Sequence, residues 1–361
     1  QLGSTIFGEA IEDQSGNSVS MNAVGDRVVI GAWLNNGNGA NTDAGHVRIF
    51  SWDGSSWAQL GQDIDGESAG DYCGRSVSMN AAGDRIAIGA THNADNGSIS
   101  GHVRIFSWNG AAWVQLGTDI DGEAAYDMSG WAVSMNDLGD RLAIGGHAND
   151  GNGSNSGHVR IFSWNGAAWV QLGADIDGEA ANDMLGYSVS MNGVGDRLAI
   201  GAPYNTPSGH VRIYEYSSGT WNQLGADVDG ESTGDNSGHS VSMNSSGDRV
   251  VVGSIYGNSP VNSGHSRIYD WDGIAWNQIG QDIDGEAAND ESGCSVSMNS
   301  SGDMIAVGAK LNDDNGNDAG HVRVFGAPAL ACPLPLDITI LPTIIGDTTI
   351  LSACDSTVWN S

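Results

Sequence analysis

Short runs of alternating apolar and polar residues, separated by segments rich in Gly, Asn and Ser, recur along this chain. Each run is long enough for one strand and lacks the 3.6-residue period of an amphipathic helix. In one unit the alternation predicts four strands, at 130–136, 141–145, 157–164 and 168–176. Asn165-Gly166, between the last two, is a strong hairpin signal. We therefore expect an all-β unit of four antiparallel strands.

The same unit is copied six times. The phrase G-D-R followed by an apolar stretch has its Asp at 26, 84, 140, 196, 248 and 303. The phrase G-H-V-R-I-F, with small variations, has its His at 46, 102, 158, 210, 265 and 321. Four-stranded units repeated at this period are typical of β-propeller blades. The repeats predict a six-bladed β-propeller, with seven blades as the alternative.

The two ends of the repeat region complement each other. Gln1-Leu2-Gly3 matches the end of the W-x-Q-L-G strand, and the last unit stops after residues 320–325, before its own fourth strand. We expect residues 1–6 to supply that outer strand and close the ring. Residues 1–325 would form the propeller. Residues 326–361 would form a Pro-rich extended tail, or the start of a further β-unit, that packs on the propeller or adds a strand to a neighbour.

The charge balance is strongly acidic, with 44 Asp and Glu against 13 Lys and Arg and a net charge of −31. Such a surface repels phosphate backbones and anionic lipids, so we expect neither nucleic-acid binding nor direct membrane insertion. Acidity, polar loops and a single lysine favour a secreted, extracellular protein. Cys332 and Cys354 are the candidate disulfide, whereas Cys73 and Cys294 cannot be paired from sequence.

Acidic residues recur where the fourth strand runs into D-I-D-G-E. Alternate carboxylates on an extended segment project to one side, and Ca²⁺ takes six to eight such oxygens. The candidate calcium ligands are Asp63, Asp65, Glu67, Asp71, Asp119, Asp121, Glu123, Asp127, Asp175, Asp177, Glu179 and Asp183. Arginines repeat in step with these acids, which favours turn capping and ion pairs over calcium. The first unit has Thr5 and Phe7 at the two Asp positions, so a calcium site should fail there.

The repeated histidine is not accompanied by a repeated nucleophile, and no hydrolase, zinc-protease or phosphate-loop motif is present. Residues that are copied in every unit are most simply explained by a structural role in each blade. The sequence therefore predicts that the protein is not an enzyme.

Positions that differ between units are better candidates for a binding site. The residue before each S-V-S-M-N strand varies, as does the residue after each return strand, and both would lie on one face of the ring. The first set is Asn17, Arg75, Trp131, Tyr187, His239 and Cys294, and the second is Trp33, Thr91, His147, Pro203, Ile255 and Lys310. We expect Asn17, Arg75, Trp131, Tyr187, His239, Trp33 and His147 to contact a sugar or peptide. The alternative is an unconstrained loop position.

The motifs W-x-Q-L-G-x-D-I-D-G-E-A, S-V-S-M-N and G-H-V-R-I-F resemble the FG-GAP-like propeller repeats of large secreted bacterial surface proteins. Residues 353–360, A-C-D-S-T-V-W-N, resemble the start of an Ig-like repeat. The resemblance implies extracellular adhesion or a structural role, in some cases with calcium. The calcium loop of integrin-type repeats is replaced here by a short N-x-x-G-D turn.

Together these features predict a secreted structural or adhesive protein that assembles into a fibre through its tail. Its partners would be copies of itself, other surface proteins or glycans. The alternative is a carbohydrate- or peptide-binding module, and a hydrolase is less favoured. Thr348 and Ser356 lie in short motifs that resemble bacterial O-glycosylation sites.

Overall fold

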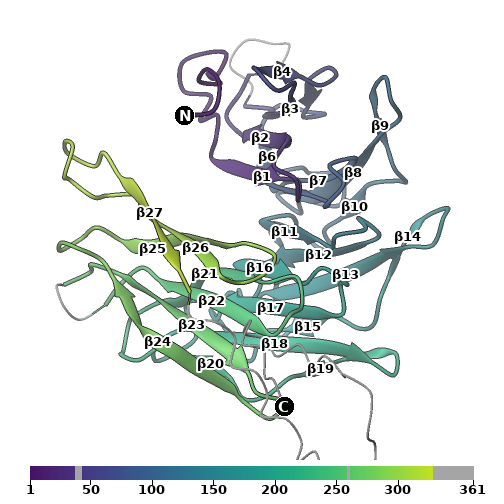
Figure 1. Cartoon of the computed structure of the whole chain (residues 1–361). Helices are drawn as coiled ribbons and strands as arrows, with labels where there is room; N and C mark the ends of the chain where they lie inside the picture. The colour runs from purple at the N-terminus through teal and green to yellow at the C-terminus, as the bar shows by residue number, and fades with distance from the viewer. Residues whose placement is uncertain (37–42, 258–260, 328–361) are drawn as a thin grey trace, which may run out of the picture. The chain divides into compact units, whose positions relative to one another are not determined.

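The computed structural model describes residues 1–36, 43–257 and 261–327. Every regular element in these residues is a β-strand, and the strands form six antiparallel sheets that follow one another in a ring (Figure 1). The prediction of an all-β propeller with six blades is confirmed. The described residues contain no helix that is long and apolar enough to cross a membrane.

The blades follow chain order. The first contains β1 (Ser18–Met21), β2 (Arg27–Ala32), β3 (His46–Trp52), β4 (Trp57–Gln59) and β5 (Ile64–Asp65). The second contains β6 (Cys73–Met79), β7 (Arg85–Ala90), β8 (His102–Trp108), β9 (Trp113–Gln115) and β10 (Ile120–Asp121). The third contains β11 (Ala132–Met135), β12 (Arg141–Gly146), β13 (His158–Trp164), β14 (Trp169–Gln171) and β15 (Ile176–Asp177).

The remaining blades repeat this order. The fourth contains β16 (Ser188–Met191), β17 (Arg197–Ala202), β18 (His210–Ser217), β19 (Thr220–Gln223) and β20 (Val228–Asp229). The fifth contains β21 (Ser237–Met243), β22 (Arg249–Ser254), β23 (His265–Trp271) and β24 (Trp276–Asp284). The sixth contains β25 (Ser292–Met298), β26 (Met304–Ala309) and β27 (His321–Gly326).

The predicted fourth strand is divided in two in the first four blades. In the first blade, β4 and β5 both pair with β3, and Gly61 lies between them with φ of +87°. A Cβ on Gly61 would lie 2.9 Å from Trp113 of the next blade. The strand therefore breaks where a tryptophan of the neighbouring blade approaches its backbone. In the fifth blade β24 runs through as one strand with an irregular register.

The hydrophobic core lies between neighbouring blades. One cluster joins Val29 and Ile49 of the first blade to Ile86, Ile88 and Phe106 of the second. Similar clusters occupy the next junctions. Burying each sheet face against the next sheet makes successive blades mutually dependent.

Repeated polar side chains also connect neighbouring blades. Trp113 Nε1 donates to the Leu60 carbonyl at 2.9 Å, and this bond recurs for Trp169, Trp221 and Trp276. Arg85 Nη1 donates to the Gly139 carbonyl at 2.9 Å. The copied Trp and Arg residues thus act as scaffold, since they satisfy backbone groups of the adjoining blade.

The sixth blade departs from the prediction. Its sheet has three strands, and residues 1–6 form no strand, so the predicted closing strand is absent. The N-terminal segment nevertheless contacts the first blade as the end of a fourth strand contacts the next blade elsewhere. Trp57 Nε1 donates to the Leu2 carbonyl at 3.3 Å, as Trp113 Nε1 does to the Leu60 carbonyl. Val19 of β1 is 61 % exposed, whereas its counterpart Val77 is 9 % exposed. The first blade therefore lacks the packing that buries this position in the second.

Candidate functional site

The variable residues before the inner strands are positioned by glycines. Gly74 adopts φ of +86° beside a bulge in β6, and the bulge displaces Arg75 from the regular strand register. A Cβ on Gly31 of the preceding blade would lie 2.2 Å from the Gly74 carbonyl oxygen. Both positions therefore require glycine, while the residue after Gly74 is free to vary.

These variable residues contact one another from blade to blade. The Arg75 guanidinium carbon lies 4.0 Å from the Trp131 ring centroid and 5.8 Å from that of Trp33. The Trp131 and Tyr187 ring centroids are 5.5 Å apart, and those of Tyr187 and His239 are 5.0 Å apart. Side chains from five successive blades thus form one continuous row.

His147, from the second variable set, packs into this row. Its ring centroid lies 4.2 Å from that of Trp131 and 5.7 Å from that of Tyr187. We call the six contacting residues the variable-face cluster: Trp33, Arg75, Trp131, His147, Tyr187 and His239. All six were predicted from the sequence. Asn17 was predicted too, but it is exposed and, among the described contacts, has no side-chain contact with the cluster.

Other residues, which were not predicted to bind a ligand, extend the cluster. Tyr72 packs edge-on against Trp33 at 4.9 Å between centroids, and His92 lies 4.3 Å from Tyr72. Tyr204 lies 6.2 Å from Tyr187. Lys310 Nζ forms an ion pair with Glu291 Oε2 at 2.8 Å. Tyr72 and Glu291 occupy one repeat position, and His92 and Tyr204 occupy another, so these positions also vary between units.

Burial controls protonation in the cluster. It lowers the pKa of His147 to about 4, helped by the positive charge of Arg75. It lowers the pKa of His239 to about 4 as well, helped by Lys310. Both imidazoles are therefore neutral at pH 7. His147 Nδ1 is buried and makes no hydrogen bond, and His239 Nε2 lies 3.4 Å from the Tyr187 hydroxyl.

Arg75 is a half-buried cation without a carboxylate partner. Burial lowers its pKa, and no ion pair joins it to an acid among the described residues. The faces of Trp33 and Trp131 supply the electrostatic compensation. The six arginines of the H-V-R motifs, to which Arg75 does not belong, all reach carboxylates.

The candidate calcium acids go to separate partners. Asp71, Asp127 and Asp183 each accept a backbone N–H three residues earlier, at 2.8 Å. The first Asp of each segment accepts a hydrogen bond from a glutamine side chain: Asp63 from Gln59, Asp119 from Gln115 and Asp175 from Gln171. The second Asp lies in a strand paired with the repeated histidine: Asp65 with His46, Asp121 with His102 and Asp177 with His158. The Glu lies beside an arginine of the next blade: Glu67 beside Arg104, Glu123 beside Arg160 and Glu179 beside Arg212. Turn capping and ion pairing, the favoured interpretation, thus describe these contacts. Calcium binding stays a prediction.

Cys73 and Cys294 are free thiols. The proposed disulfide of Cys332 and Cys354, the motifs around Thr348 and Ser356 and the Ig-like segment lie outside the described residues.

Comparison with known proteins identifies the repeat. Residues 283–325, from the end of β24 through β27, match the family model of the FG-GAP repeat. This propeller is FG-GAP-like. Among curated proteins, none matches the sequence.

The FG-GAP-like propeller is similar in fold to several solved structures. A protein from Bacteroides uniformis assigned as a 6-phosphogluconolactonase has a TM-score of 0.60 and 10 % identity, over 86 % of this chain and 80 % of that one. A Bacteroides fragilis protein with the same assignment has a TM-score of 0.57 and 13 % identity, over 86 % and 80 % of the chains. The periplasmic gluconolactonase of Pseudomonas aeruginosa has a TM-score of 0.54 and 12 % identity, over 87 % and 89 %.

These comparisons contradict two predictions. A secreted structural or adhesive role, with assembly into a fibre, finds no support, because the propellers that share the fold are described as lactone-hydrolysing enzymes. The prediction that the chain is not an enzyme is wrong on the same ground. Residues copied in every unit gave no sign of catalysis, whereas the variable-face cluster brings together side chains that occur in this arrangement only once among the described residues.

Proposed function

We propose that this propeller is a hydrolase that opens a negatively charged, sugar-derived lactone at the variable-face cluster. The observation that carries the proposal is Arg75, a half-buried guanidinium stacked on Trp131 without a carboxylate partner. A cation held in this way is poised to bind an anionic group of a ligand. The likeness in fold to gluconolactonases suggests which class of anionic ligand to test.

The aromatic side chains suit a sugar ring. Trp131, Tyr187 and His147 pack against one another and present several rings beside the Arg75 guanidinium. An apolar wall with a few polar groups is the usual composition of a small-molecule site. Arg75 would bind the charged substituent, and the rings would contact the face of the sugar.

His239 is our candidate base. It is only half-buried, its imidazole is neutral at pH 7, and its Nε2 lies near the Tyr187 hydroxyl. In the proposed reaction His239 takes a proton from water as the water oxygen bonds to the lactone carbonyl carbon. The resulting tetrahedral intermediate breaks the ring C–O bond, and the alkoxide receives the proton from His239 to give a hydroxy acid.

The proposal is tested by following acid release from gluconolactone and 6-phosphogluconolactone against the spontaneous rate. We expect the protein to accelerate hydrolysis, and His239→Gln to lower kcat by about 100-fold or more. Asn17→Ala is the matched control, because Asn17 holds the equivalent position in the first blade but lies outside the cluster; it should leave kcat unchanged. Binding of either lactone without turnover, or equal rates for the two variants, would overturn the proposal.

A further inference from the structure

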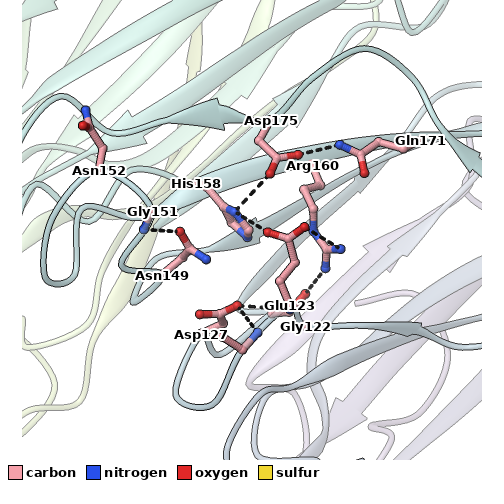
Figure 2. Close-up of polar contacts among 12 residues, drawn as sticks. Gly122, Glu123, Asp127, Asn149, Gly151, Asn152, His158, Arg160, Gln171 and Asp175 are labelled. Carbon is pink, nitrogen blue, oxygen red and sulfur yellow. Dashed lines mark hydrogen bonds and ion pairs between the residues drawn. The ribbon is translucent and has the colours of Figure 1, made fainter. Parts of the chain in front are cut away.

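A second polar cluster recurs between blades, on residues the proposed reaction does not use. In the third blade, His158 Nδ1 lies 3.7 Å from Glu123 Oε2 and 4.0 Å from Asp175 Oδ2 (Figure 2). Glu123 comes from the preceding blade, and its other oxygen lies 3.9 Å from Arg160 Nη1. Each such group offers one imidazole and two carboxylates.

The second blade carries a fuller version of this group. Here Asp95 joins Glu67, His102 and Asp119, and one ligand atom from each lies within 4.8 Å of all the others. His102 Nδ1 lies 3.9 Å from both Glu67 Oε2 and Asp119 Oδ2. These distances are too long for hydrogen bonds, so Nδ1 makes none, although the His102 side chain is only 1 % exposed.

We propose that Glu67, Asp95, His102 and Asp119 bind a divalent transition-metal ion such as Zn²⁺ or Mn²⁺. Two ligand atoms 3.9 Å apart can both lie about 2.0–2.3 Å from one shared ion. One imidazole with three carboxylates is a donor set for Zn²⁺ or Mn²⁺, whereas Ca²⁺ takes oxygen ligands alone. A buried imidazole nitrogen without a hydrogen bond, facing three carboxylates, is the atom that such an ion would satisfy.

The surroundings support a cation at this point. Gln115 Nε2 donates to Asp119 Oδ1 at 2.5 Å, which leaves Oδ2 facing His102. The Asp95 backbone N–H donates to Asn93 Oδ1 at 3.0 Å and so fixes the turn that presents the carboxylate. Asp121, which pairs with His102 in the strand register, adds to the negative charge gathered here. Arg104, 3.6 Å from Glu67 Oε1, neutralises only part of it.

The third blade provides an internal control. Gly151 stands at the position of Asp95, and a Cβ built on it would lie 3.3 Å from Asp177 Oδ1 and 2.9 Å from Asn149 Oδ1. Asn149 caps the Gly151 N–H as Asn93 caps that of Asp95, so a small shift of the Asn149 side chain lets an aspartate occupy the same turn. Gly151→Asp should therefore add the missing fourth ligand to Glu123, His158 and Asp175.

The test is calorimetric titration of the metal-free chain with Zn²⁺, Mn²⁺ and Ca²⁺. We expect Asp95→Asn to remove one Zn²⁺ or Mn²⁺ equivalent or weaken its Kd at least about tenfold, and Gly151→Asp to add one equivalent. Asp150→Asn, in the corresponding loop of the third blade, is the control and should change neither. Identical isotherms for the wild type and Asp95→Asn, or binding of Ca²⁺ as tight as that of Zn²⁺ and Mn²⁺, would overturn the proposal. Asp95 is exposed, so its substitution does not threaten folding.

Discussion

The guanidinium carbon of Arg75 lies 4.0 Å from the ring centroid of Trp131, although the two residues belong to neighbouring blades. Each is the variable residue of its own repeat, placed by a glycine of positive φ just before it. The contact therefore exists only because two unlike residues occupy equivalent positions in adjacent copies. This contact makes one part of the otherwise repetitive ring chemically different from the rest.

Replacing Trp131 with leucine removes the ring over which Arg75 is stacked. Cation–π interactions contribute about 0.5–2 kcal/mol, so we expect KM for 6-phosphogluconolactone to rise about 2- to 30-fold with little change in kcat. Trp164→Leu, in the outer hairpin of the same blade, is the control because Trp164 pairs with Trp169 away from the cluster. Steady-state kinetics compare the two variants, and a similar rise in both would contradict this role.

Buried neutral histidines make the fold sensitive to acid. The pKa of His147 is about 4 in the folded chain, below the value of 6.5 of a free histidine. Between these values the unfolded chain binds more protons, so stability is complete above pH 6.5 and falls as the pH drops toward 4. His147 alone accounts for about 2 kcal/mol lost between pH 7 and pH 5.

Urea unfolding of the wild type and His147→Gln at pH 7 and pH 5 measures this loss. The glutamine variant should lose less stability than the wild type over that interval. An equal loss in both proteins would show that His147 is not buried as a neutral base.

Contact between blades also constrains the glycines of the fourth strand. Gly117 and Gly110 both have positive φ, but a Cβ on Gly117 would lie 3.0 Å from Trp164 and Trp169, whereas nothing surrounds Gly110. We expect Gly117→Ala to lower the free energy of unfolding by about 1–3 kcal/mol more than Gly110→Ala. Thermal unfolding of both variants gives the comparison, and equal shifts in Tm would show that only the backbone angle matters.

The junction of the first and sixth blades can be probed with one matched pair of substitutions. Val19 and Val77 occupy the same repeat position, but Val19 is exposed and Val77 is buried. Val77→Thr should lower the free energy of unfolding by about 1–3 kcal/mol, and Val19→Thr should change it by no more than about 0.5 kcal/mol. Equal losses would mean that Val19 is covered in solution.

The repeat pattern predicted the blades, and the positions that break the repeat predicted six residues of the variable-face cluster. The alternation of apolar and polar residues identifies strands directly, and residues that differ between units mark positions that the fold does not constrain. The division of the fourth strand at Gly61 was not predictable in this way, because it depends on Trp113, 52 residues later in the chain. Tyr72, His92 and Glu291 were missed although they too occupy positions that vary between units, because variation alone does not show which loop side chains reach the cluster.

The grouping of His102 with Glu67, Asp95 and Asp119 was missed for a related reason. The acids of one D-I-D-G-E segment were expected to act together, whereas the fold combines Glu67 and Asp119 of two successive segments with Asp95 of a loop around His102. Only the packing of one blade on the next brings them within reach of one another.

The central claim is that Arg75 binds the anionic group of a sugar-derived lactone. The most direct measurement is the ratio of kcat/KM for 6-phosphogluconolactone to that for gluconolactone in the wild type, Arg75→Met and Asn17→Ala. We predict a ratio well above one in the wild type and in Asn17→Ala, falling by about tenfold or more in Arg75→Met, because charged hydrogen bonds contribute about 1.5–3 kcal/mol. A ratio that is the same in all three proteins would contradict the claim.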